Sequence, residues 1–134
     1  MPMDSRVSKP ATILVVDDQT ANVDLVRRWL EADGHAVVTA TSGEGALAAV
    51  QEFRPDVVVL DIMIPAPTGF EVCQRLKRDP ATRHIPVVLM SGLQDPSNWK
   101  RGLEVGAAGL LQKPLQGADV RAKIREMLEQ SRQR

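Results

Sequence analysis

Short apolar runs recur along the chain and alternate with longer segments in which apolar and polar positions mix. The runs at 12–17, 56–61 and 85–90 are continuous, which is typical of strands covered on both faces of a sheet. Further runs lie at 36–40 and 109–113. The pattern therefore predicts five short strands at broadly regular spacing.

The segments between these runs show the spacing of amphipathic helices. After the first run, Val23, Val26 and Leu30 fall at i, i+3 and i+7, and a glycine stop follows at 33–35. The second helix is expected to have Ser42 as its cap and to carry Leu47, Val50 and Phe53, and the third to have Thr68 as its cap and to carry Val72 and Leu76. The fourth helix is expected to start near Pro96 and Ser97 and to carry Trp99 and Leu103. The last helix is expected to carry Val120, Ile124, Met127 and Leu128.

Strand–helix alternation, five times over, predicts a doubly wound α/β fold with a parallel sheet and helices on both faces. Right-handed crossovers put the carboxyl ends of all the strands on one edge. In such sheets the ligand site lies outside that edge, near the point where the strand order reverses. The side chains at the strand ends are therefore the first candidates for chemistry.

Acidic, hydroxyl and amine side chains stand at four of these strand ends. Asp17 and Asp18 end the first strand and Asp61 the third, whereas Ser91 follows the fourth and Lys113 ends the fifth. Carboxylates this close repel one another, so a counter-charge is expected, and Mg²⁺ suits oxygen ligands and phosphate. The set matches phosphoryl transfer to a carboxylate, with Asp61 as the nucleophile, Lys113 neutralising charge and Ser91 donating to a phosphoryl oxygen.

Each of these residues taken alone has a simpler interpretation. A valine-rich strand that ends in Asp61 fits a turn or cap carboxylate, and Asp17 with Asp18 fits a helix N-cap pair. The convergence of all five groups on one edge favours a functional site.

Composition and charge limit the classes of partner. Seventeen basic residues balance seventeen acidic ones, so we expect no direct contact with nucleic acid and none with an anionic membrane. No apolar run approaches the roughly 20 residues of a membrane helix, and the first ten residues lack the apolar centre of a secretory signal. The single cysteine, Cys73, fits a reducing compartment and is expected to be a small core residue. We therefore expect a cytoplasmic protein.

A chain of 134 residues has room for one domain. The expected division is a flexible leader at 1–11, the domain at 12–130, and a tail or the start of a linker at 131–134. The sequence leaves open whether the chain is a stand-alone protein or part of a longer one. His35 and His84 lie in turn-like segments far apart in the sequence, and structural or surface roles are expected for both.

Six motifs, in order and at the right separations, carry a resemblance to a known family. They are ILVVDD, SGEGAL, PDVVVLDIMIPAPTGFEVC, IPVVLMSG, GLEVGAAGLLQKP and the amphipathic end of the chain. Together they resemble the receiver domain of bacterial two-component response regulators, over nearly the whole chain from about residue 12 to 128. The resemblance implies a flavodoxin-like (βα)5 fold whose five-stranded parallel sheet has the order 2-1-3-4-5.

The resemblance also implies roles for individual residues. Asp61 matches the phosphoacceptor, which takes its phosphoryl group from a sensor histidine kinase or a histidine phosphotransfer protein. The cofactor implied is Mg²⁺, with Mn²⁺ as the alternative. The other matching positions are Asp18 as a direct metal ligand, Asp17 as a ligand through water, Met63 as the backbone carbonyl ligand, Ser91 as the switch hydroxyl, Lys113 as the lysine of the site, and Pro114 as the proline of a cis bond.

The sequence departs from the family pattern at one residue, one short segment and one loop. Leu110 stands at the switch position where many members have an aromatic residue, and the chain contains no tyrosine. The segment 107–109 lacks a common acidic pair, so the face of the fourth and fifth helices, a possible homodimer or output-domain surface, should be less acidic. In the loop after Asp61, Pro65 and Pro67 predict a stiff lip over the site, with Gly69 absorbing the turn.

The leading function is a phosphorylation-controlled signalling module that catalyses only its own phosphorylation and dephosphorylation, and is otherwise not an enzyme. The first alternative is a pseudo-receiver adaptor that acts by protein–protein binding without phosphorylation. A phosphohydrolase is disfavoured because Met63 stands where a second acid is needed. A flavin or nucleotide binder is disfavoured because no glycine-rich loop follows the first strand.

Overall fold

Five strands and five helices alternate along the described part of the chain. The structure is a computed structural model, and it describes residues 10–92 and 96–132. The expected leader therefore lies almost entirely outside the described residues. The elements are β1 Thr12–Val16, α1 Thr20–Ala32, β2 Ala36–Ala40, α2 Gly43–Phe53, β3 Val57–Asp61, α3 Gly69–Arg78, β4 Val87–Ser91, α4 Pro96–Glu104, β5 Gly109–Gln112 and α5 Gly117–Arg132.

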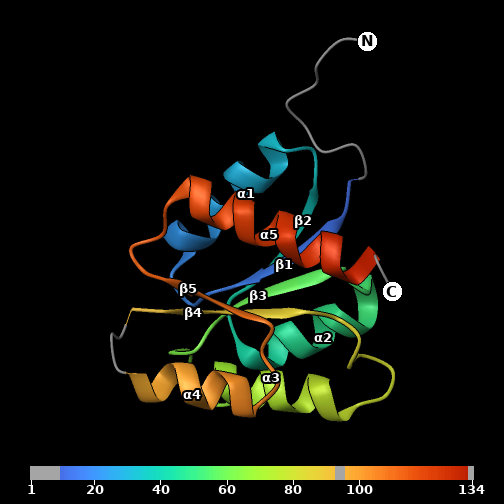
Figure 1. The fold of residues 1–134 in the computed structure, drawn as a ribbon, viewed down its shortest axis with the longest axis vertical. Helices are drawn as coiled ribbons and strands as arrows, with labels where there is room; N and C mark the ends of the chain where they lie inside the picture. The colour runs from blue at the N-terminus through green and yellow to red at the C-terminus, as the bar shows by residue number, and fades with distance from the viewer. Residues whose placement is uncertain (1–9, 93–95, 133–134) are drawn as a thin grey trace.

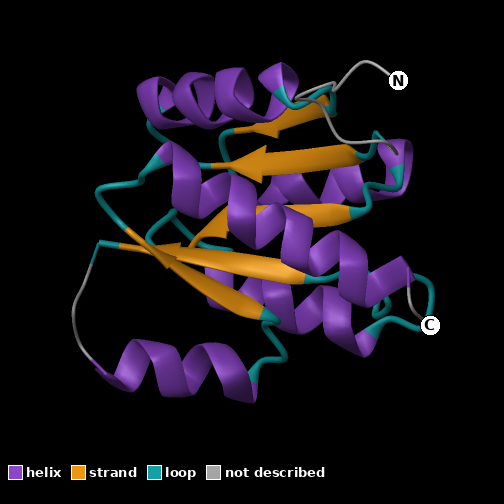
Figure 2. Ribbon diagram, turned by 45° about the horizontal axis from the view of Figure 1, so that its top comes forward, coloured by secondary structure: helices purple, strands orange, loops and turns teal. Residues whose placement is uncertain are grey.

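The five strands form one parallel sheet in the order β2-β1-β3-β4-β5, which confirms the predicted fold. The strand arrows point toward one side of the molecule (Figure 2). Val16 is paired with Leu60, Asp61 with Met90, and Ser91 with Gln112. This register brings the carboxyl ends of β1, β3, β4 and β5 to the same edge.

Helices cover both faces of the sheet, with α1 and α5 on one face and α2, α3 and α4 on the other (Figure 1). Alternate residues of each strand enter different cores. On β1, Ile13 and Val15 pack toward α1 and α5, whereas Leu14 and Val16 pack toward α2 and α3. The two-sided burial explains why this run is apolar throughout. Within 10–92 and 96–132, no helix is long and apolar enough to cross a membrane.

Local signals start and stop the helices where the sequence indicates. The Ser42 hydroxyl accepts a hydrogen bond from the Gly45 N–H at 3.0 Å, and α2 begins there. Thr68 and Glu71 form a reciprocal capping box at the start of α3. After α1, Gly34 takes a φ of 95°, which favours glycine.

Several sequence-based boundaries shift by one or two residues, each for a local reason. The carboxylate of Asp56 accepts the Thr12 N–H at 2.8 Å, so β3 begins after it. Ile85 bonds back to Thr82 in a turn, and Pro86 has no N–H to donate, so β4 begins at Val87.

Three large apolar residues that the sequence places on helices are exposed in the structure. Phe53 is 48% exposed, because α2 buries the smaller residues Ala46, Ala49 and Val50. Trp99 and Leu103 are 43% and 55% exposed, because α4 approaches the sheet through a glycine that packs against Leu89. Among the described residues of α4, Gly102 alone is buried, so this helix rests on the sheet by a small contact.

Candidate functional site

The sheet edge at the carboxyl ends of the strands gathers the predicted acidic residues. Asp17 directly follows β1, and Asp61 is the last residue of β3. Carboxylate oxygens of Asp17, Asp18 and Asp61 lie within 4.8 Å of one another. Asp17 and Asp61 are buried, at 0% and 3% exposure, whereas Asp18 is exposed. The cluster is therefore open to solvent on the Asp18 side.

Lys113 joins this cluster from the end of β5. Its Nζ donates to Asp17 Oδ2 and to Asp61 Oδ2, at 2.8 Å in each case. The backbone N–H of Lys113 bonds to Ser91 O at 2.8 Å, which ties the lysine to the end of β4. One ammonium group thus bridges two buried carboxylates.

The environment of Lys113 keeps its side chain charged. Burial acts to lower the pKa of Lys113, but the hydrogen bonds with Asp17 and Asp61 and the charges of both carboxylates act to raise it, and the pKa is raised overall. Only about a fifth of the side chain is exposed (21%). The site therefore holds a permanent positive charge beside its acids.

The two buried carboxylates also accept hydrogen bonds from donors other than Lys113. Asp61 Oδ1 accepts the backbone N–H of Met63 at 2.9 Å. Asp17 Oδ1 accepts the backbone N–H of Gln19 at 2.9 Å, and Asp17 Oδ2 accepts Asn22 Nδ2 at 3.2 Å. The sequence reasoning missed Gln19 and Asn22. The available signal was a polar Asn22 in the first turn of the helix, directly before the buried Val23.

Three oxygen-bearing carboxylates around a solvent-open position fit a hard divalent cation. One ammonium does not balance three carboxylates, so the cluster retains net negative charge that a cation would offset. The donor set contains no sulfur or imidazole, which disfavours softer metals. The acidic pocket is therefore compatible with Mg²⁺ and with phosphorylation.

Other predicted site residues surround this cluster. Ser91 is the last residue of β4 and is 1% exposed. Met63 follows Asp61 by two positions, and its side chain is 60% exposed. The peptide bond between Lys113 and Pro114 is cis. Leu110, on β5, is half-buried and packs against the core under α2 and α3.

The loop after Asp61 is held by close backbone contacts. A Cβ atom on Gly69 would lie 2.3 Å from Asp61 O and 2.6 Å from Ile62 Cα. A Cβ atom on Gly43 would lie 2.2 Å from Pro67 O. The expectation that Gly69 absorbs the turn was therefore wrong. Gly69 has no positive φ, and it is needed because α3 starts directly against the backbone of the Asp61 strand end.

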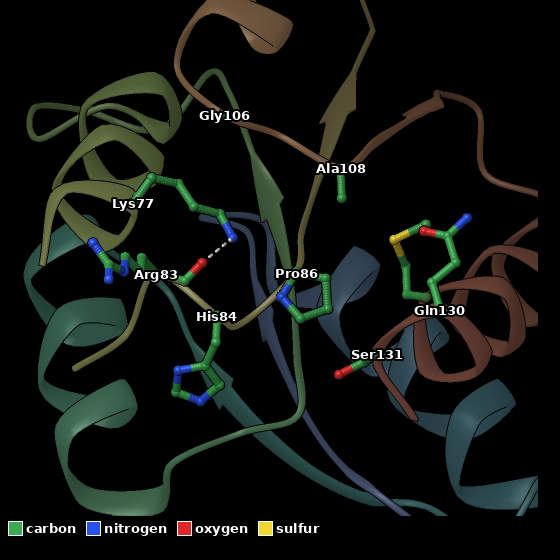
Figure 3. A pocket seen from close by; sticks show the side chains of 9 residues that line it. Lys77, Arg83, His84, Pro86, Gly106, Ala108, Gln130 and Ser131 are labelled. Carbon is green, nitrogen blue, oxygen red and sulfur yellow. Dashed lines mark hydrogen bonds between the residues drawn. The ribbon is translucent and has the colours of Figure 1, made fainter. Parts of the chain in front are cut away.

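A second cavity, of about 270 Å³, lies at the opposite edge of the sheet, beside the starts of β4 and β5 (Figure 3). Lys77 crosses its wall and donates to the backbone oxygens of Arg83, at 3.0 Å, and of Ile85. Helices α3, α4 and α5 end near this edge, and helix C-termini favour positive charge. We therefore assign Lys77 to the stabilisation of the loop between α3 and β4 rather than to a ligand.

The chain is similar to proteins of one family over most of its length. A family model described as response regulator receiver domain matches residues 13–125. The response regulator PleD of Caulobacter vibrioides is 45% identical over 117 residues, which cover 87% of this chain and 26% of PleD. The transcriptional regulatory protein AfsQ1 of Streptomyces coelicolor is 41% identical over 123 residues, which cover 89% of this chain and 51% of AfsQ1.

Solved structures of response regulators are similar to this fold as well. The structure of the chemotaxis response regulator CheY4 of Vibrio cholerae matches with a TM-score of 0.84 and 30% identity, and the match covers 90% of this chain and 100% of that one. The chain thus spans about a quarter of PleD and about half of AfsQ1, whereas it matches the whole of the chemotaxis regulator.

Proposed function

The chain belongs to the receiver domain family of two-component response regulators, and we propose on that basis that its Asp61 carboxylate accepts a phosphoryl group. The observation that carries the proposal is the placement of Asp61. It stands buried at a strand end, with the Lys113 ammonium at 2.8 Å and two further carboxylates within 4.8 Å. Few structural roles need three acids and a lysine so close together.

The proposed reaction is attack by a carboxylate oxygen of Asp61 on the phosphorus of a phosphohistidine. An O–P bond forms, the P–N bond breaks, and the electron pair leaves with the imidazole nitrogen, which takes up a proton. The transferred group carries its charge on three equatorial oxygens, so catalysis consists mainly of positioning and neutralisation. The donor is a sensor histidine kinase or a histidine phosphotransfer protein.

Each site residue has a part in this proposal. Asp18, Asp61 and the Met63 carbonyl would hold Mg²⁺, or Mn²⁺ in its place, and Asp17 would act through water. When bound, the cation supplies charge that offsets the crowded carboxylates and the phosphoryl oxygens. Lys113 neutralises a phosphoryl oxygen, and the Ser91 hydroxyl donates to another.

The output is a change in affinity for a partner. Phosphorylation adds roughly two negative charges at the edge of the sheet, and the state with Ser91 turned toward the phosphoryl group is then favoured. Helix α4 rests on a small contact and exposes Trp99 and Leu103, so the face of α4 and α5 is the proposed surface for a homodimer or an output domain. The absence of direct nucleic-acid contact and the cytoplasmic location stay predictions.

The test is the mass of the intact protein after incubation with Mg²⁺ and acetyl phosphate. We expect a phosphate-sized increase in the wild type, and none in Asp61→Asn or in wild type treated with a chelator. Asp56→Asn is the matched control, because it changes a carboxylate at the other end of the same strand and keeps an oxygen that can accept the Thr12 N–H. We expect it to be phosphorylated normally.

Two outcomes would contradict the proposal. A wild type that gains no mass would support the alternative of a pseudo-receiver adaptor, in which Leu110 and its surroundings serve protein binding alone. An adduct that persists in Asp61→Asn would move the phosphoacceptor to another residue.

A further inference from the structure

Asp17 is the most completely enclosed carboxylate of the site. It is 0% exposed, and protein donors reach both of its oxygens. The Gln19 N–H reaches Oδ1 at 2.9 Å, whereas Lys113 Nζ and Asn22 Nδ2 share Oδ2 at 2.8 and 3.2 Å. The side chain of Asp17 is therefore oriented by its neighbours.

The amide of Asn22 has a defined orientation. Its Nδ2 donates to Asp17 Oδ2 and, at 3.0 Å, to Gln19 Oε1. A rotation that exchanged the amide oxygen and nitrogen would set oxygen against two oxygen acceptors, so the NH₂ group must face Asp17. The backbone of Asn22 is held as well, because the next residue, Val23, is buried.

Asn22 does not act as an ordinary helix cap. The N-cap of α1 is Gln19, whose side chain makes no cap hydrogen bond. The Asn22 Nδ2 donates to two side-chain oxygens, Asp17 Oδ2 and Gln19 Oε1. The bond to Asp17 therefore bears on the site more directly than on the start of the helix.

Lys113 transmits this arrangement to Asp61. Its ammonium is equidistant from Asp17 Oδ2 and Asp61 Oδ2, so Oδ2 of Asp17 is one of the two acceptors that hold the ammonium beside Asp61. When Lys113 turns to a phosphoryl oxygen, Asp17 loses a donor while it remains buried. Asn22 is the side-chain donor that stays on the same oxygen.

We propose that Asn22 is a positioning residue of the phosphorylation site, which acts through Asp17 to hold Lys113 in place beside Asp61. This inference rests on the proposed function. Outer groups that orient the residues of a metal or catalytic site typically contribute ten- to a hundredfold to affinity or activity.

The first test compares phosphorylation rates at saturating Mg²⁺, followed by the mass of the intact protein after addition of acetyl phosphate. We expect Asn22→Ala to be about tenfold slower than the wild type. Asn22→Asp keeps the size of the side chain but cannot donate, so its loss should be at least as large. Asp24→Ala is the matched control, because it removes a polar group of α1 that accepts a hydrogen bond from Arg27 on the surface, and it should react at the wild-type rate.

The second test asks whether Asn22 acts through Asp17. In a double-mutant cycle, Asn22→Ala should slow the wild type but add no further loss to Asp17→Asn. The Mg²⁺ dissociation constant, measured by calorimetry, closes the same cycle independently of the reaction rate. There we expect Asn22→Ala to weaken Mg²⁺ binding several-fold in the wild type and not in Asp17→Asn.

The outcomes separate this inference from the proposed function. A wild type that is phosphorylated on Asp61 and an Asn22→Ala variant with unchanged rate and Mg²⁺ affinity would overturn the inference alone. Losses that add fully in the cycle would also overturn it, because Asn22 would then act independently of Asp17. A wild type that forms no adduct would contradict the proposed function first. Urea unfolding of every variant shows whether a lost activity reflects a lost fold.

Discussion

Buried polar side chains differ in their bonding between the acidic site and the rest of the molecule. At the site, Asp17 and Asp61 are buried and share the Lys113 ammonium. Elsewhere a buried polar group is satisfied by backbone groups: the Thr82 hydroxyl donates to Leu76 O at 2.7 Å and to Asp79 O at 3.5 Å, and His35 Nδ1 accepts the Ala11 N–H at 3.0 Å. Polar groups leave water only where a partner replaces it, and the site differs because several of its groups compete for the same partner.

Cys73 gives a prediction at this scale. The residue is 0% exposed, its thiol lies 3.5 Å from Val105 O, and burial raises its pKa to about 11, although the nearby Lys77 ammonium acts in the opposite direction. The thiolate is the reactive form, and at pH 8 only about one thiol in a thousand is ionised at this pKa. We expect iodoacetamide to label the folded protein at least about a hundredfold more slowly than the urea-unfolded protein.

Intact mass as a function of time measures this labelling. Cys73→Ala is the control, since the chain has one cysteine. A folded protein that is labelled at nearly the unfolded rate would show that the α3 core opens readily.

Two helix starts lie so close to the backbone near the site that only glycine fits at the point of contact. Helix α3 begins with a capping box at Thr68, and its first residue, Gly69, lies against the backbone of Asp61 and Ile62. The start of α2 meets the loop in the same way, with Gly43 against Pro67. The carboxyl end of β3 is thus packed closely against the starts of α2 and α3, whereas α4 buries only Gly102 among its described residues.

Gly69→Ala tests the close contact of α3. Its Cβ would lie 2.3 Å from a backbone oxygen, so the helix or the strand end must move. We expect the free energy of unfolding to fall by about 3 kcal/mol, at the upper end of overpacking in protein cores. Urea denaturation followed by circular dichroism measures the change.

Gly92→Ala is the matched control for this substitution. Its Cβ would meet Lys113 Cβ at 3.9 Å, which is ordinary contact, so the free energy of unfolding should change by no more than about 0.5 kcal/mol. Equal stability of the two variants would mean that the start of α3 can shift at little cost.

The two edges of the sheet hold different kinds of interaction. The carboxyl edge holds the acidic cluster, and the opposite edge holds the interactions that tie the chain's elements together. There His35, at 5% exposure, accepts the Ala11 N–H, and Asp56 accepts the Thr12 N–H. Burial lowers the pKa of His35, Asp33 and Asp56 act to raise it, and Arg132 acts to lower it. The neutral imidazole is therefore the form that the fold favours.

The pH dependence of folding follows from His35. As the pH falls through about 6.5, the unfolded chain binds a proton at this residue before the folded protein does, so the free energy of unfolding decreases. A protonated Nδ1 can no longer accept the Ala11 N–H, and an unsatisfied buried donor costs on the order of 1–3 kcal/mol. We expect the wild type to be less stable in urea at pH 5.5 than at pH 7.5.

His35→Asn isolates this contribution, because its amide oxygen can accept but does not titrate in this range. The variant should lose less stability than the wild type between the two pH values. An equal loss in both proteins would assign the effect to other groups.

The amino-acid sequence by itself determined the elements, the fold and the acidic edge. Apolar periodicity is a local property, and the short continuous runs at β1, β3 and β4 are typical of strands covered on both faces. Once five strands are parallel, residues at their carboxyl ends must meet, which is why Asp17, Asp61 and Lys113 were found from the sequence. Capping by Ser42 and Thr68 was equally local.

Only the tertiary structure decided which of these groups touch and which apolar residues stay outside. Lys113 bonds to Asp17 and Asp61, which precede it by 96 and 52 positions in the chain, and no local sequence pattern predicts contacts over such separations. Phe53 looked like a core residue, but the packing of α2 turned it outward. Asn22 looked like an ordinary helix residue until Asp17 was placed beside it. Strand register and the rotation of each helix about its axis set these contacts. Both depend on how the helices pack on the whole sheet, and the local sequence does not specify that packing.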